Sequence, residues 1–433
     1  MKADWGEDFQ TSTPIEYILT VPAVWSDKAK SDTLYCASQA GFGSVGKIRL
    51  ITEPEAAAIY TLHQLPDFMV KKGDVFITCD CGGGTVDLTT YMVSNTDPHL
   101  RVNELTMGSG GLCGSVYLNK RFEELVRGRI GKQIDALSKS EALEAMDEMQ
   151  RIFNDERLEL TQNEQLTVPA VVKGTEEAQV EDSQLAVTAA DLRDQVFEPV
   201  IRQILQHITG QLERVEDAPG SPSVTAILLV GGFGSSTYLR KRVESHFDGE
   251  DLPKIKVIQP VNAWSAVTLG ALLRGIEGGI VETRIIRAAY GVQAREPWTP
   301  EVHEQGELKR TAEKNKYLDP SEAFTNEKIV VFPFYRALSS LDDLVFRTNL
   351  ISYAGDDEKP PYFFNPDTKV VGTLVSDLSK IPKEKFEVTH SSRGSYYKIW
   401  YQVEMRFEAM ITFRLRFDGE TLGEIALDYS HSR

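Results

Sequence analysis

Two acidic residues flank a run of three glycines in the segment from Val75 to Leu88. An apolar stretch ends at Asp80, Gly82–Gly84 follow, and Asp87 opens a second apolar stretch. Successive glycines leave no Cβ between the backbone and a ligand, so several N–H groups can point at one anion. Mg²⁺ is usually held by one or two carboxylates together with phosphate and water. The segment therefore favours a strand, a phosphate-binding turn and a second strand, with a glycine hairpin and two solvated acids as the alternative.

Length and composition indicate a large globular protein. The chain has 433 residues, of which 41% are hydrophobic and 26% charged, so it can form two or three domains. Its net charge of −17 argues against general binding to nucleic acid or to anionic membranes. We find no apolar run of membrane-spanning length and no signal-like apolar stretch at the start. Four cysteines without zinc-site spacing predict buried free thiols in a reducing compartment, expected to be the cytoplasm, with the nucleus as a further option.

Apolar runs of strand length alternate with runs of helical periodicity up to residue 277, which predicts an α/β domain. Strands are expected within 15–25, 48–51, 75–93, 99–106 and 254–258, in a small hairpin within 166–187 around Lys173-Gly174, and from 225 into the glycine turn at 231–232. Helices are expected at 26–41, 52–60, 116–130, 140–160, 189–215 and 264–275. Pro199 either kinks the helix that contains it or marks its true start.

The pattern changes after Gly278, where short alternating runs separated by turns replace helical periodicity. Residues 403–417 carry apolar side chains at every second position, which is typical of a half-buried antiparallel strand. Asp418-Gly419 predicts a hairpin turn after it. The sequence therefore predicts an α/β domain at 1–277 and a smaller β-sandwich-like domain at 278–433.

Several motifs resemble the heat shock protein 70 (DnaK-like) chaperone family of the actin-like ATPase superfamily, and they occur in the family's order. The segment 75–88 resembles the second phosphate loop, 51–59 the first connecting helix, and 228–232 the adenosine motif. Further similar pieces are 18–23, 198–200 and 266–271. Because ordered context supports a motif assignment, the resemblance over residues 12–277 implies an actin-like (ribonuclease H-like) ATPase fold.

The resemblance implies a Mg²⁺-ATP or Mg²⁺-ADP site. Asp80 and Asp87 would organise the metal ion and its waters, and Glu53 would lie near the attacking water. The loop formed by Gly82, Gly83, Gly84 and Thr85 would cradle the β- and γ-phosphates. On this basis the catalytic group would be Glu53, Asp80, Thr85 and Asp87.

Other residues would bind the rest of the nucleotide. The resemblance places Gly110 and Gly111 beside the ribose and phosphates, and Gly231 and Gly232 in the adenosine loop. Arg157 matches a cation that stacks on adenine, although a solvated surface arginine is equally compatible with its position.

Some family features do not occur in the sequence. The first phosphate loop, an N-terminal Asp-Leu-Gly-Thr-Thr-type hairpin, is absent, and so is the lysine that follows it. The resemblance therefore implies that the N-terminal part of the ATPase domain is missing and that hydrolysis is weak, because removing one positioned donor commonly costs ~100-fold in rate. Trp264 and Phe233 replace an acid and a small hydroxyl residue, as in the divergent, lid-less branch of the family.

Two functions of different classes stay open. One is an ATP-binding chaperone-type protein whose partners would be nucleotide, unfolded polypeptide clients or co-chaperones. The other is a non-catalytic interaction scaffold built on the same fold. A small-molecule kinase of the superfamily is less favoured, because no motif for a catalytic base between two lobes is found, and a β-rich C-terminal part argues against a filament protein. Nucleotide binding would distinguish the first two.

Overall fold

The chain folds into two units in a computed structural model. One unit comprises Met1–Val24 and Gly46–Val281, and the other comprises Trp25–Val45 and Glu282–Arg433. The structure describes residues 13–43, 47–65, 70–156, 165–169, 180–181, 184–218, 220, 222–249, 255–285, 288–296, 312–317, 323–325, 329–353, 366–391, 394–407 and 409–428. Whether the two units correspond to the expected functional domains, 1–277 and 278–433, stays a prediction.

The central sheet of the first unit is built around β3 (Val75–Cys81), a strand that is buried along its whole length. On one side β3 pairs in parallel with β10 (Val224–Val230), which pairs in parallel with β11 (Lys256–Ile258). On the other side β3 pairs antiparallel with β4 (Val86–Asn95), which pairs antiparallel with β5 (Arg101–Glu104). The short strand β6 (Ser109–Gly111) also pairs with β4. This mixed order, β11-β10-β3-β4-β5, is consistent with the expected actin-like fold.

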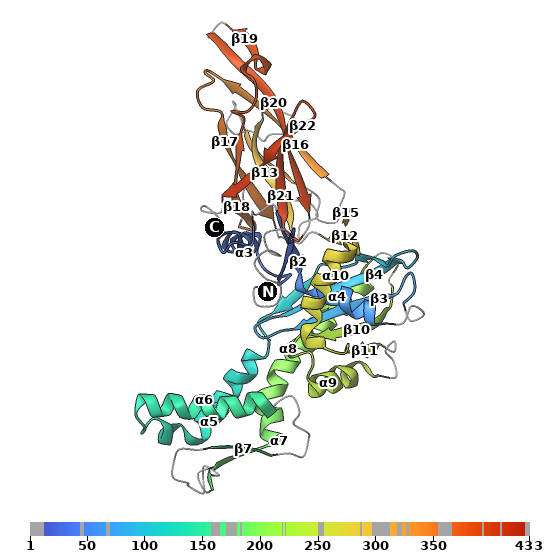
Figure 1. The fold of residues 1–433 in the computed structure, drawn as a ribbon, viewed down its shortest axis with the longest axis vertical. Coiled ribbons are helices and arrows are strands. Elements are labelled where there is room, and N and C mark those ends of the chain that lie inside the picture. Colours follow the sequence, from blue (N-terminus) through green and yellow to red (C-terminus); the bar gives the residue numbers. More distant parts are fainter. Residues whose placement is uncertain are drawn as a thin grey trace. The chain divides into compact units, whose positions relative to one another are not determined.

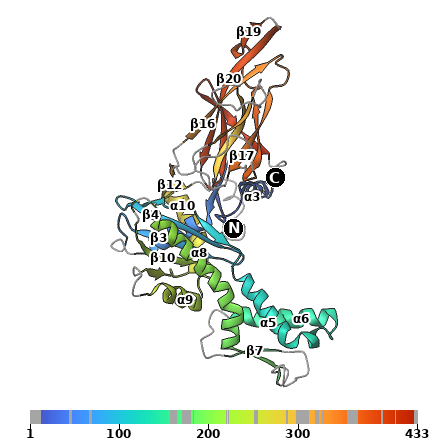
Figure 2. The ribbon, with the colours of Figure 1, turned by 180° about the vertical axis from the view of Figure 1, so that it is seen from behind.

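Helices cover both faces of this sheet. Successive residues of β3 point to opposite faces, so the strand contributes side chains to both cores. Ile77, Cys79 and Cys81 face the larger core. The helices of that core are α5 (Val116–Ile134), α6 (Lys139–Glu156), α8 (Glu198–Glu216) and α9 (Thr237–Phe247), which can be followed in Figures 1 and 2. Phe76 faces a second core, with α4 (Glu53–Gln64) and α10 (Ala266–Glu277). Asp80 lies on this second side, at the end of the strand.

Glycine and proline define the packing and the start of two helices. A Cβ on Gly270 would collide with the carbonyl of Ala56, so α10 and α4 pack backbone to backbone, as the small residues of 264–275 predict. Pro199 occupies the first turn of α8, directly after a π-helical turn at Leu192–Phe197. Proline therefore marks the start of the regular helix and does not kink it.

Smaller sheets complete the first unit. β1 (Tyr17–Val21) and β2 (Ile48–Thr52) form a parallel pair. The predicted hairpin within 166–187 is confirmed by the pairing of β7 (Gln165–Pro169) with β9 (Gln184–Thr188), and β8 (Val180–Glu181) also pairs with β9. The expected tip at Lys173-Gly174 lies outside the described residues.

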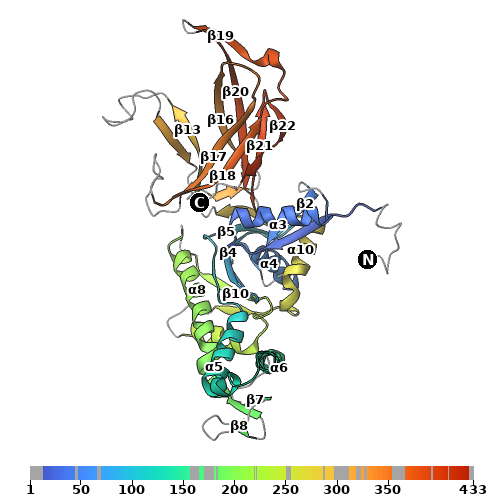
Figure 3. The same ribbon diagram turned by 90° about the vertical axis from the view of Figure 1, so that its left-hand side faces the viewer.

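The second unit is a β-sandwich of two antiparallel sheets (Figure 3). One contains, in order, β14 (Ala312–Tyr317), β13 (Ala289–Glu296), β17 (Val345–Tyr353), β18 (Thr368–Asp377) and β23 (Ala426–Asp428). The other contains β16 (Ile329–Leu338), β20 (Gly394–Phe407), β21 (Ile411–Phe417) and β22 (Glu420–Glu424), with β19 (Glu387–Ser391) also paired to β20. Apolar side chains from both sheets share one core, as in sandwiches generally.

Two further elements belong to this unit. β12 (Val281–Ile285) pairs with β15 (Ala323–Thr325). α3 (Asp27–Gln39) begins at the predicted N-cap, Ser26, whose hydroxyl accepts a hydrogen bond from the N–H of Ala29. The Tyr290 hydroxyl donates to Asp27 at 3.1 Å, which ties α3 to β13.

The apolar alternation across residues 403–417 extends over two strands. Residues 403–417 form a hairpin of β20 and β21, with Phe407 facing Ile411 across the pair. The alternation continues through both strands because both bury the same face, so periodicity alone conceals the turn. The turn predicted at Asp418-Gly419 is confirmed, and both residues adopt positive φ angles of 49° and 82°.

Within the described part of the chain, no helix is both long enough and apolar enough to cross a membrane.

Candidate functional site

Asp80 and Asp87 face each other across the antiparallel pair of β3 and β4. Directly opposed residues project their side chains to the same side of the sheet. Asp80 is 5% exposed and Asp87 is 1% exposed. The N–H of Val24 donates to Asp87 Oδ1 at 3.0 Å, which orients that carboxylate. The structure thus forms a buried acidic pair from the two acids that flank the glycine run.

Glu53 adds a third carboxylate at the first position of α4. Burial, and then repulsion from Glu53 and Asp87, raise the pKa of Asp80 to about 8. Burial and repulsion from Asp87 likewise raise the pKa of Glu53 to about 7. Each negative charge therefore disfavours the others, and the cluster would be stabilised in its ionised form by a nearby cation.

The glycine loop between the two strands is held by backbone hydrogen bonds from the start of α5. The N–H of Gly82 donates to the carbonyl of Thr85 at 3.0 Å and closes the turn. The loop's carbonyls then accept hydrogen bonds from N–H groups at the start of α5: Ser115 to Gly82 at 3.1 Å, Val116 to Gly83 at 2.8 Å, and Gly114 to Gly84 at 3.3 Å.

Gly83 and Gly84, at the tip of the loop, are exposed. In a trans peptide the N–H points away from the C=O of the same unit, so the N–H groups of Gly83, Gly84 and Thr85 are directed away from α5. A Cβ built on Gly83 or Gly84 would meet nothing within 4 Å. Aligned N–H groups beside open space form the type of nest that binds phosphate.

Two other glycine segments meet the acidic pair. Gly110 in β6 faces Asp87 in the register, and a Cβ there would collide with the Val86 carbonyl. Gly231, at φ +87°, lies so close to Asp80 that a Cβ would collide with its carboxylate. Three of the predicted segments therefore converge on Asp80 and Asp87, and only glycine permits two of these close approaches.

The remaining predicted residues are placed as follows. Gly111 lies against the imidazole of His207, where a side chain would collide. Gly232 is exposed and has open space above it, and Thr85 is half-buried at the end of the glycine loop. Arg157 lies outside the described residues, so its expected stacking on adenine stays a prediction.

Sequence reasoning missed several residues around this site. The N–H groups of Gly114 and Ser115, which hold the glycine loop, carry no side-chain signal. Gln211 and His207 on α8 contact the glycine segment Met107–Gly111. A signal for Gln211 was present, because it occupies a buried position on the apolar stripe of α8.

The donor set fits Mg²⁺ better than a metal that needs a complete protein cage. Across the described ranges, no group of three or more His, Cys, Asp or Glu side chains could hold a metal ion by itself. Mg²⁺ needs no such group, since it keeps several waters and takes one or two carboxylates plus phosphate. Buried oxygen donors beside an open N–H nest meet that requirement.

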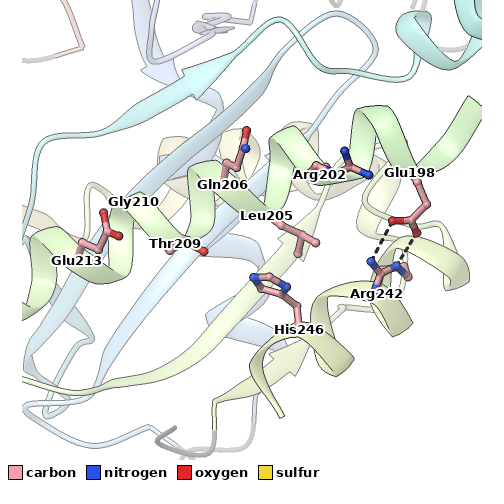
Figure 4. A pocket seen from close by; sticks show the side chains of 9 residues that line it. All are labelled: Glu198, Arg202, Leu205, Gln206, Thr209, Gly210, Glu213, Arg242 and His246. Carbon is pink, nitrogen blue, oxygen red and sulfur yellow. Dashed lines mark hydrogen bonds and ion pairs between the residues drawn. The ribbon is translucent and has the colours of Figure 1, made fainter. Parts of the chain in front are cut away.

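A separate groove lies between α8 and α9, with a volume of about 500 Å³ (Figure 4). None of the predicted site residues lines it. At one end Glu198 accepts two hydrogen bonds from Arg242, at 2.6 and 2.9 Å, and a third from the Tyr238 hydroxyl at 2.8 Å. This ion pair joins the two helices and is satisfied without a ligand.

Comparison with known proteins gives a consistent family signal. No protein family model matches the chain. Heat shock 70 kDa protein 12A of Mus musculus and of Homo sapiens are each 23% identical over 456 residues, covering 86% of this chain and 65% of the relative. Heat shock 70 kDa protein 12B of Homo sapiens is 24% identical, covering 67% of this chain and 52% of that protein. The chain thus spans less than two thirds of its relatives' length, and its resemblance to the heat shock protein 70 family is confirmed through the 12A and 12B proteins.

Proposed function

We propose that this chain binds a magnesium nucleotide, ATP or ADP, as a heat shock protein 70-like protein of chaperone type. The observation that carries the proposal is the buried pair of Asp80 and Asp87 beside an exposed glycine loop whose carbonyls are bonded to the start of α5, so that its N–H groups point the other way. Two features of the site support the proposal. Burial and mutual repulsion raise the pKa of Asp80 and of Glu53, and the N–H nest suits negative charge, so a metal–phosphate complex would stabilise both parts of the site.

Each part of the site has a distinct proposed role. Asp80 and Asp87 would hold Mg²⁺ and its waters, and bound Mg²⁺ would neutralise phosphate charge. The N–H groups of Gly83, Gly84 and Thr85 would bind the phosphate oxygens. Glu53, at the start of α4, would orient a water molecule and accept its proton, which its raised pKa of about 7 favours near neutral pH.

We further propose that hydrolysis by these 433 residues is weak. Phosphoryl transfer depends on positioning and charge stabilisation from several groups at once. The sequence provides one of the family's two phosphate loops and no matching lysine. Unfolded polypeptide or a co-chaperone would be the protein partner, and a cytoplasmic or nuclear location is proposed with it.

Thermal unfolding with and without Mg-ADP tests the proposal, using Asp87→Asn beside the parent. Ligand at one hundred times its dissociation constant stabilises the native state by about 2.7 kcal/mol. We expect a clear rise of Tm in the parent, which disappears with EDTA and in the variant. Glu213→Asn, on the α8–α9 groove and away from the site, serves as a control that keeps the shift.

The contrary result would favour the scaffold. If millimolar Mg-ADP leaves the Tm of the parent unchanged while the unfolding stays cooperative, nucleotide binding by this chain is wrong. The non-catalytic interaction scaffold would then be the better account, because it requires the fold and no ligand.

A further inference from the structure

Gln211 makes an unusual set of contacts for a residue on the apolar face of a helix. It lies on α8 and its side chain is completely buried. Its amide oxygen accepts hydrogen bonds from the hydroxyls of Thr90 at 2.9 Å and Thr106 at 2.7 Å. Its amide nitrogen donates to the carbonyl of Met107 at 3.0 Å and to the hydroxyl of Ser109 at 2.7 Å. A glutamine amide has two acceptor sites and two donor hydrogens, so its capacity is fully used.

These four partners lie on two sides of the amide. Thr90 belongs to β4, the strand that also carries Asp87. Thr106 and Met107 come shortly before β6, Ser109 is the first residue of β6, and Gly110 of β6 faces Asp87. The amide of Gln211 therefore connects the strand that bears the acidic pair to the glycine segment opposite it.

The glycine segment Met107–Gly111 is paired with β4 through Ser109, Gly110 and Gly111, and Gln211 holds it from α8 as well. Gly110 and Gly111 have no side chains to pack, and Met107 before them is 40% exposed. Glycine has the largest conformational freedom of any residue, so such a segment is costly to hold in one conformation. Gln211 donates two hydrogen bonds where the glycine segment begins, to the Met107 carbonyl and the Ser109 hydroxyl. His207, one turn earlier on α8, packs against Gly111.

We propose that Gln211 is a positioning residue of the nucleotide site, which fixes the segment from Met107 to Gly111 at the distance from Asp87 that bound nucleotide requires. The proposal rests on the proposed function and adds a residue on α8 that touches no ligand itself. An apolar side chain would fill the same core position, but it would leave the Met107 carbonyl and the Ser109 hydroxyl without this partner.

Two variants separate positioning from general stability. Gln211→Met keeps the length of the side chain and removes all four hydrogen bonds. Thr90→Val removes one bond to the same amide on the strand side and leaves both bonds to the glycine segment in place. Both should lower Tm, whereas only the first should loosen the glycine segment.

Two measurements are made on each variant. Isothermal titration with Mg-ADP should give a Kd raised at least tenfold in Gln211→Met and within twofold of the parent in Thr90→Val. Amide hydrogen exchange of the ligand-free protein should show lost protection across residues 109–111 in Gln211→Met and retained protection in Thr90→Val. If Gln211→Met fails to fold, Ser109→Ala removes one loop-side bond alone and should raise Kd about threefold.

The outcomes are distinguishable. A parent-like Kd in Gln211→Met, or an equal loss of affinity in Thr90→Val, would overturn the positioning role. If the parent itself binds no Mg-ADP, the proposed function fails. In that case unchanged exchange in Gln211→Met overturns the anchoring role, and lost protection upholds it.

Discussion

Buried carboxylates occur in both units of the molecule, but their surroundings differ. In the β-sandwich, Glu404 is 2% exposed, and Arg416 donates to it at 2.7 Å while Arg406 lies at 3.6 Å. In the α/β unit, Asp80 and Asp87 are equally buried but face each other and Glu53. Glu404 is paired with arginines from its own sheet, whereas the negative charge of Asp80 is opposed by Glu53 and Asp87.

The difference indicates which acids are structural and which are reserved for a ligand. An ionised group is held in a protein interior when a counter-charge and hydrogen bonds replace its water. Glu404 has both within its own unit. A site whose buried acids repel one another is costly for the free protein, and such perturbed groups are typical of functional sites.

Removing the paired acid should give the largest loss of stability. In Glu404→Gln the two arginines lose their partner, which costs up to about 3–5 kcal/mol for a fully buried pair. The side chains of Arg406 and Arg416 are 31% and 32% exposed, so solvent screens part of this loss. We expect a loss of about 1–3 kcal/mol in urea unfolding of the second unit. The matched control is Glu420→Gln on the exposed strand β22, and an equally large effect there would contradict the account.

Removing one of the mutually repelling acids should have the opposite sign. Asp80→Asn keeps the shape of the side chain and removes a group whose pKa is raised to about 8 in the folded protein, mainly by burial. A raised carboxyl pKa means that stability is greatest below the unfolded value and is lost as pH rises toward 8. The variant should therefore melt a few degrees above the ligand-free parent, with a gap that widens from pH 5 to pH 8.

A lower stability of Asp80→Asn would contradict this role of Asp80. If Asp80→Asn lowers Tm of the ligand-free protein at pH 8, the carboxylate contributes to the fold as Glu404 does. The comparison between the two units would then fail.

The smallest effect is expected at the half-buried acid of the α8–α9 groove. The pKa of Glu198 is lowered, chiefly by its hydrogen bonds from Arg242. A lowered carboxyl pKa gives stability that is present above the unfolded value and lost as pH falls through the folded one. Glu198→Gln should cost up to about 1 kcal/mol at pH 7, since the pair is partly exposed, and nothing near pH 3. A cost that persists at pH 3 would point to lost packing in place of lost charge.

Much of the fold could be predicted because certain residues have strong backbone preferences. Gly82–Gly84 separate two apolar runs, Pro199 starts α8, and Asp418-Gly419 forms the expected turn. The apolar alternation across 403–417 does not by itself mark the turn between β20 and β21, because that turn contains no glycine or proline. Backbone preference locates a turn only where the turn contains a residue, such as glycine or proline, that favours the turn conformation.

Less of the candidate site could be predicted, because its contacts join distant segments. The acids and glycines were found from a short motif and a family resemblance. The hydrogen bonds from the start of α5 to the glycine loop involve backbone atoms alone, so no residue type in the sequence predicts them. Glu404 looked like a polar position on an alternating strand, and its burial depends on Arg416 from the next strand.

The most direct test is isothermal titration of Mg-ADP into the parent, Asp80→Asn and Glu404→Gln. We expect the parent to bind Mg-ADP. Asp80→Asn should bind it with at least tenfold lower affinity, although this variant is more stable than the parent. Glu404→Gln should bind it with unchanged affinity, although this variant is less stable than the parent. Parent-like affinity in Asp80→Asn would contradict the claim that the buried acids of the α/β unit are reserved for a metal–phosphate ligand.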